Sequence, residues 1–190
     1  MSCLNSALAA LLGTGLIATT LPATAQTVVP AQSEIGFVSK QMGVPVEGKF
    51  KKWTAQIAFD PKKPEAGKVA FTIVTASASF GSPETDAEVP KATWFNVAKF
   101  PNATFASTSI KAKGGGKFDV AGKLTVKGTT KDIVVPIAVA QAGGTTTATG
   151  AFALKRTDYK IGEGEWADTS MVADEVQVKF KIALSGVGPL

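Results

Sequence analysis

Residues 117–140 read KFDVAGKLTVKGTTKDIVVPIAVA, and this stretch decides the class of fold. In its first half, apolar residues such as Phe118, Val120 and Leu124 lie two or four positions apart. A short connection, Gly128-Thr129-Thr130, then leads into a second apolar run. A period of two is typical of half-buried β-strands, and a short connection favours antiparallel neighbours. The stretch therefore predicts a β-hairpin with one buried face.

The same alternation continues on both sides of this hairpin. The other runs are SEIGFVS (33–39), WTAQIAF (53–59), VAFTIVT (69–75), ATFASTSI (103–110), ATGAFALKR (148–156) and EVQVKFKIAL (175–184). Turn-forming Gly, Pro and Lys segments separate them. No run has the length and period of an amphipathic helix, although residues 85–99 are compatible with one or two short helical turns broken by Pro90.

Long strands without a long helix indicate an all-β barrel or sandwich. Four glycines, Gly36, Gly48, Gly122 and Gly150, fall within or beside the strands, where glycine permits sharp bending. We therefore expect an eight-stranded antiparallel β-barrel with short helical turns between strands. One Tyr and three Trp are too few for the two aromatic girdles of a membrane-spanning barrel.

The first 25 residues differ from the rest of the chain. They contain no charged residue, have an apolar centre, and end in Ala23-Thr24-Ala25, which matches an A-x-A cleavage pattern. This pattern predicts a secretory signal peptide over residues 1–25 and a single domain over residues 26–190, in the periplasm or secreted. An uncleaved membrane anchor is the alternative, although the apolar run is shorter than the roughly 20 residues of a spanning helix.

The composition excludes several classes of function. The chain has no His, and its single Cys, Cys3, precedes the expected cleavage site, so no zinc site, disulfide or cofactor is predicted. The formal net charge of +5 is spread over the chain, and the only arginine is Arg156. Proteins that read nucleic acids use Arg and stacked aromatic rings, so no nucleic acid is expected as a partner.

Catalysis has little support from the residue types. The usual His or Cys bases and nucleophiles are missing, and we expect no enzyme activity. One alternative uses the acidic residues near the C-terminus in a carboxylate-dependent hydrolase acting on a glycan or a lipid. Those residues are Asp158, Glu163, Glu165, Asp168, Asp174 and Glu175. A solvated, charge-rich loop explains the same residues without any chemistry.

Four segments together resemble the YceI family across nearly all of residues 26–190. They are SEIGFVSKQMGVPVEGKFKKWTAQIAFDP (33–61), ATWFNVAKFPNATFASTSI (92–110), VAGKLTVKGTTKDIVVPIAV (120–139) and FALKRTDYKIGEGEWADTSMVADEVQVKFKIAL (152–184). The resemblance implies a lipocalin-like barrel that holds a polyisoprenoid lipid, such as a quinone or a polyprenyl phosphate, in an apolar tunnel. Relatives with GEGEW followed by Asp are associated with b-type membrane cytochromes, so such a cytochrome is an implied partner. Many relatives carry His where Gln41 and Val89 stand here.

The site residues are expected on the inward face of the strands and on the aromatic segment before residue 101. The predicted wall consists of Ile35, Phe37, Phe50, Trp53, Ile57, Phe71, Ile73, Trp94, Phe95, Phe105, Leu124, Phe152, Leu154, Phe180 and Ile182. The inward direction of each side chain is inferred from its odd or even position along the strand. Ordinary core packing explains each of these residues equally well. A partner-docking domain with a filled barrel therefore stays open as a second alternative, and so does the oligomeric state, including a dimer.

Arg156 and Tyr159 are the predicted head-group residues of the ligand-binding site. Phe152, Leu154 and Arg156 share one strand face, so Arg156 is expected to point inward near the strand end. A guanidinium offers five donors in a plane for a phosphate or a quinone carbonyl. The competing interpretation, which we favour slightly, pairs Arg156 with a carboxylate such as Asp158 or Glu175, because an unpaired buried guanidinium is costly.

Overall fold

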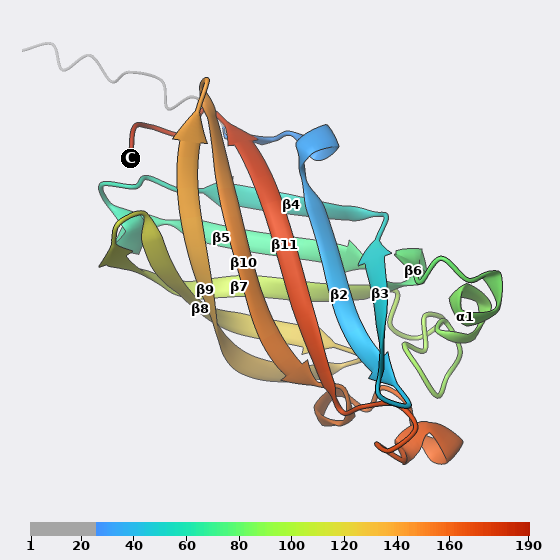
Figure 1. The fold of residues 1–190 in the computed structure, drawn as a ribbon. Helices are drawn as coiled ribbons and strands as arrows, with labels where there is room; N and C mark the ends of the chain where they lie inside the picture. The colour runs from blue at the N-terminus through green and yellow to red at the C-terminus, as the bar shows by residue number, and fades with distance from the viewer. Residues whose placement is uncertain (1–25) are drawn as a thin grey trace, which may run out of the picture.

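The computed structural model describes residues 26–190 and shows a single curled antiparallel sheet with a few short helical turns (Figure 1). The strands are β1 (Thr27–Val28), β2 (Glu34–Gln41), β3 (Val44–Phe50), β4 (Trp53–Ala58), β5 (Lys68–Val74), β6 (Ala78–Ser79), β7 (Asn102–Gly114), β8 (Lys117–Val126), β9 (Thr129–Ala142), β10 (Thr145–Lys155) and β11 (Glu175–Ser185). The helical turns are α1 (Pro83–Glu88) and the 3-10 turns η1 (Pro30–Gln32), η2 (Pro64–Ala66), η3 (Thr75–Ser77), η4 (Thr157–Tyr159) and η5 (Gly164–Ala167).

The sheet order is β4-β5-β7-β8-β9-β10-β11-β2-β3-β6, and β1 pairs with β11 beside this path. In Figure 1 the strands β9, β10, β11 and β2 cross in front of β4, β5 and β7, so the sheet curls back until its two halves face each other. The chain passes from β3 to β4 through Lys51 and Lys52. Their backbone hydrogen bonds to Ser77 and Val74 connect the β3–β6 end of the sheet to the β4–β5 end.

The expected all-β antiparallel barrel class is confirmed, but the strand count of eight is wrong. The eight alternating runs appear as β2, β4, β5 and β7 to β11, and β1, β3 and β6 are additional. Strand β3 contains Pro45 and Gly48, residues that lower the strand tendency of a run. With two residues each, β1 and β6 are too short to show any period.

Three of the strand glycines make room for phenylalanine rings on a neighbouring strand. A Cβ added at Gly48 would lie 2.4 Å from the Phe37 ring, and one at Gly150 would lie 2.5 Å from the Phe180 ring. Gly122 is covered in the same way, because its added Cβ would lie 2.5 Å from Phe105. The glycines therefore let each ring lie flat over the facing strand, which holds it at the inner surface of the sheet.

Two clusters form the hydrophobic core inside the curled sheet. The first is built around residues such as Ile35, Tyr159 and Ile182, and the second around Phe59 and Phe118. The Phe59 and Phe118 rings meet edge to face with their centroids 5.1 Å apart. Partly buried hydrophobic side chains pack against both clusters, and Ile57, Phe105 and Val187 contact the two of them.

Candidate functional site: an apolar cavity inside the sheet

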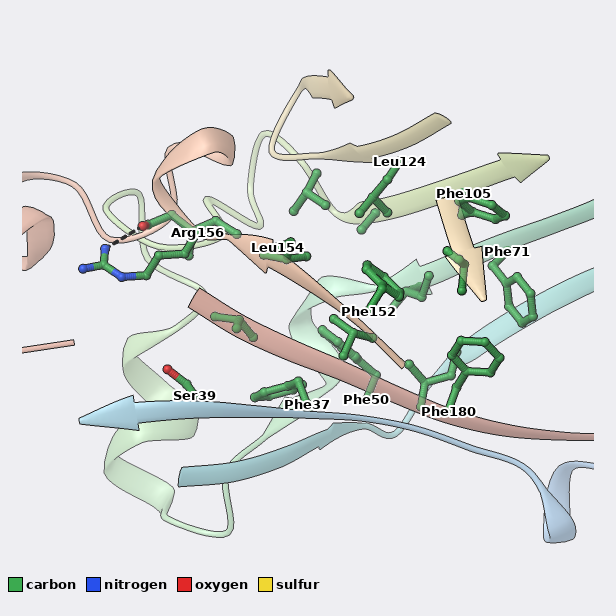
Figure 2. Close-up of a pocket in the computed structure, with 18 of the residues that line it drawn as sticks. Phe37, Ser39, Phe50, Phe71, Phe105, Leu124, Phe152, Leu154, Arg156 and Phe180 are labelled. Carbon is green, nitrogen blue, oxygen red and sulfur yellow. Dashed lines mark hydrogen bonds between the residues drawn. The ribbon is translucent and has the colours of Figure 1, made fainter. Parts of the chain in front are cut away.

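Inward side chains of the strands enclose a cavity of about 540 Å³. Figure 2 shows Arg156 and Ser39 at one end of the lining, and Phe71, Phe105 and Phe180 at the other. Most lining residues are aliphatic or aromatic. The polar members of the lining are Ser39, Gln41, Glu84, Thr85, Glu88, Thr146 and Arg156.

Strand β10 shows how long the cavity is. Residues from Thr146 through Phe152 and Leu154 to Arg156 line it along the whole strand. Because a strand rises about 3.3 Å per residue, this row spans about 30 Å. The cavity therefore has the shape of a long channel with an apolar wall.

Aromatic rings concentrate where α1 and the segment after it cover the sheet. The Phe37 ring lies 5.2 Å from that of Phe50 and 5.0 Å from that of Phe80, measured between centroids. Phe95 continues the row at 6.2 Å from Phe50. These tilted and edge-to-face contacts are a favourable geometry for aromatic pairs and build a continuous apolar surface at this end of the cavity.

The end of the cavity near α1 is organised by one carboxylate. Asp86 of α1 accepts hydrogen bonds from the Ser79 hydroxyl at 2.8 Å and from the Phe80 backbone N–H at 2.6 Å. These two hydrogen bonds, the Phe80 bond first, hold the pKa of Asp86 below its ordinary value. Asp86 thereby connects α1 to strand β6, and the sequence analysis did not single it out.

Fifteen of the seventeen predicted site residues line the cavity, and two do not. The lining ones are Ile35, Phe37, Phe50, Ile57, Phe71, Ile73, Trp94, Phe95, Phe105, Leu124, Phe152, Leu154, Arg156, Phe180 and Ile182. Trp53 instead packs beside Phe71, with centroids 6.1 Å apart. Tyr159 is 2 % exposed and belongs to the hydrophobic core. That the lining residues contact a lipid stays a prediction.

Arg156 points inward as expected, but neither of its two predicted partners is found. It is 2 % exposed and donates to five backbone carbonyls. The acceptors are Ile161 at 2.9 Å, Gly162 at 3.1 Å, Asp168 at 3.5 Å, Val172 at 2.7 Å and Ala173 at 3.2 Å. The guanidinium therefore organises the segment between η4 and β11. Pairing with Asp158 or Glu175 is replaced by carbonyl contacts, and no N–H is left over for a head group.

Burial also changes the protonation behaviour of this region. Desolvation lowers the pKa of Arg156, and the negative charge of Asp174 opposes this change. Burial raises the pKa of the Tyr159 phenol, and the charge of Asp158 adds to that effect. Tyr159 therefore stays a neutral, buried ring at ordinary pH.

Lys127 is a buried charged residue whose contacts the sequence pattern did not indicate. Its backbone φ of 46°, followed by 75° at Gly128, forms the tight turn between β8 and β9. Its buried ammonium donates to Glu163 Oε2 at 2.8 Å and to the Lys160 carbonyl at 2.6 Å. The hydrogen bond and charge of Lys127 hold the pKa of Glu163 below its ordinary value. From the sequence alone, a lysine in a turn is expected to face the solvent. No local pattern therefore indicated this contact.

The predicted acidic cluster does not converge on the cavity. Asp158 pairs with Lys131 at 3.2 Å, and Glu163 pairs with Lys127. Asp174 accepts from the Thr157 hydroxyl at 2.7 Å. None of the six clustered carboxylates lines the cavity, and residues 26–190 contain no group of three or more Cys, Asp or Glu side chains arranged to hold a metal ion.

Gln41 and Val89, where the resemblance implies His in many relatives, both line the cavity. Gln41 forms an isolated antiparallel bridge with Val172, which brings the β2–β3 hairpin against the segment that Arg156 organises. Gln41 therefore belongs to the polar end of the cavity.

Comparison with known proteins decides the family. A family model described as a YceI-like domain matches residues 26–184. The chain belongs to the YceI family. A UPF0312 protein of Pseudomonas savastanoi pv. phaseolicola is 36% identical over 137 residues, which cover 70% of this chain and 71% of the relative. Protein YceI of Salmonella arizonae is 44% identical over 88 residues, 46% of each chain.

Solved structures of similar proteins share the YceI fold. Burkholderia cenocepacia BcnA is 46% identical with a TM-score of 0.80, and the match covers 83% of this chain and 99% of BcnA. A Campylobacter jejuni YCEI protein gives 25% identity and a TM-score of 0.66 over 73% of this chain and 83% of that protein. A polyisoprenoid binding domain from Saccharophagus degradans, at 18% identity, has a TM-score of 0.69 over 85% and 98% of the two chains. This last match supports the fold alone.

Within residues 26–190 no helix is both long and apolar enough to cross a membrane. The expected signal peptide, residues 1–25, lies outside the described residues and stays a prediction.

Proposed function

We propose that this YceI-family protein binds a long isoprenoid lipid, a quinone or a polyprenyl phosphate, and sequesters or carries it without chemical change. The observation that carries the proposal is the cavity itself, an apolar channel that follows β10 for about 30 Å. A linear hydrocarbon fits such a shape, whereas a compact polar metabolite does not. The Saccharophagus degradans domain is described as polyisoprenoid binding, which agrees with this assignment.

The physical basis of binding is burial of the lipid tail. Transfer of apolar surface out of water contributes about 25 cal/mol per Å², and this term needs no polar contact. The phenylalanine rings that line the channel supply the complementary surface. Most of the affinity therefore comes from the tail, and the few polar residues at one end set its orientation.

The two alternatives from the sequence have less support. A carboxylate-dependent hydrolase needs two carboxylates facing one cleft about 5–10 Å apart. None of the six acidic residues proposed for it lines the cavity, and two of them, Asp158 and Glu163, are paired with lysines. A filled, non-binding barrel does not account for a cavity of about 540 Å³.

Lipid carried by the protein is the direct test. Protein isolated gently from its native host should show bound isoprenoid lipid in a native mass spectrum and in an organic extract. The same material after extraction should bind an added long isoprenoid and ignore short polar metabolites. Native protein without any lipid would contradict the proposal.

We also propose that the protein acts in the periplasm or is secreted, after cleavage behind Ala25. Amino-terminal sequencing of exported protein should then begin at Gln26. Intact Met1 in a membrane fraction would instead establish an anchor.

A b-type membrane cytochrome, implied by the GEGEW resemblance, is the proposed protein partner.

A further inference from the structure

The charged residues that line the cavity are Glu84, Glu88 and Arg156. Arg156 donates its N–H groups to the five backbone carbonyls described above. Glu88 pairs with Lys91, and the Lys91 side chain is largely exposed. Among the described residues, the cavity lining therefore contains two carboxylates and no cationic side chain that is free to donate a hydrogen bond. An anionic head group placed here would meet these carboxylates without a free cation to compensate its charge.

Two tryptophans beside these residues have unused donors. Trp94 and Trp166 both line the cavity, and their ring centroids lie 5.5 Å apart at an interplanar angle of 50°. The Nε1 atom of each ring is buried and has no hydrogen-bond partner. An unpaired buried donor is unfavourable, and an acceptor brought to it removes that penalty.

The two rings come from segments that are independent in sequence but joined in space. Trp94 follows α1, whereas Trp166 belongs to η5. The backbone N–H groups of Gly162 and Glu163 both donate to the Thr93 carbonyl, at 2.8 and 2.9 Å. These bonds hold the two segments together at the end of the cavity where Arg156 lies.

We propose that Trp94 and Trp166 form the head-group site of the cavity, and that this site takes an uncharged head with an oxygen acceptor. This inference rests on the proposed lipid-binding function and specifies its ligand. A quinone-type carbonyl has this chemistry, and a phosphate does not. Both indole nitrogens are buried, so the proposal requires one ring to turn toward the ligand when the head group enters.

The test compares three probes on delipidated protein: a long-chain isoprenoid quinone, a polyprenyl phosphate with the same number of isoprene units, and squalene, which has no head group. Competition followed by native mass spectrometry gives relative affinities. Wild-type protein should prefer the quinone to the phosphate by at least about tenfold, because the charged phosphate faces Glu84 and Glu88 without a free cation to compensate its charge.

Variants then assign the donors. Trp94→Phe and Trp166→Phe keep an aromatic ring but remove the N–H, and each should weaken quinone binding about fivefold while squalene binding stays unchanged. Trp53→Phe is the matched control, because Trp53 does not line the cavity. It should alter neither affinity.

The outcomes separate this inference from the proposed function. Equal or tighter binding of the phosphate by wild-type protein would overturn the inference and leave lipid binding intact. Equal loss of quinone and squalene in both tryptophan variants would assign the rings to packing and would also overturn it. Failure of wild-type protein to bind any of the three probes would overturn the lipid-binding function itself.

Discussion

Replacement of Arg156 by Met should lower the free energy of unfolding by about 3 kcal/mol or more, without changing which lipid the folded protein carries. The substitution leaves five buried or partly buried carbonyls, from Ile161 to Ala173, without their donor. For a domain of this size the melting temperature should fall by roughly 6–12 °C. Thermal unfolding of purified protein, with lipid analysis of the folded fraction, measures both effects.

The neighbouring residue supplies the control for Arg156. Lys155→Met removes a positive charge from an exposed side chain of the same strand and should change stability by less than about 0.5 kcal/mol. Arg156→Lys should recover only part of the loss, because an ammonium has three donors where the guanidinium has five. Altered lipid selectivity with unchanged stability in Arg156→Met would show that Arg156 holds the head group after all.

Replacement of Phe71 by Glu should abolish lipid retention. Phe71 lines the channel in the half of the lining opposite Arg156 (Figure 2). A carboxylate there would lose its hydration when a lipid tail enters, at an effective penalty of several kcal/mol. The affinity for an isoprenoid should fall on the order of 100-fold or more, since each 1.4 kcal/mol corresponds to a factor of ten. Titration of delipidated protein measures the change.

Two variants show whether the effect comes from the channel. Thr72→Glu places the same charge on the adjacent residue, which does not line the cavity, and should leave lipid binding nearly intact. Phe71→Leu keeps the channel apolar and should lower affinity far less than Phe71→Glu. Equal lipid content in Phe71→Glu and Thr72→Glu would mean that the lipid lies elsewhere.

The alternating pattern of the sequence was enough to predict the fold class, and most of the residues that it placed inward line the cavity. Period two is a local property, so one apolar residue assigned inward places the residues two and four positions away on the same face. This is why Phe152, Leu154 and Arg156 all line the cavity as expected. It failed for Trp53, the first residue of β4, and for β3, whose Pro45 and Gly48 weaken the strand signal.

The partners of the polar groups were decided only by the tertiary structure. Parity predicted that Arg156 points inward, but its acceptors are backbone carbonyls, which every residue possesses and no side-chain pattern marks. Lys127 reaches Glu163 across 36 positions of the chain, and Trp94 meets Trp166 from a different loop. Periodicity reports which face a strand side chain occupies. The choice of partner depends on how loops fold over the end of the sheet, and that arrangement arises from contacts between residues distant in the sequence.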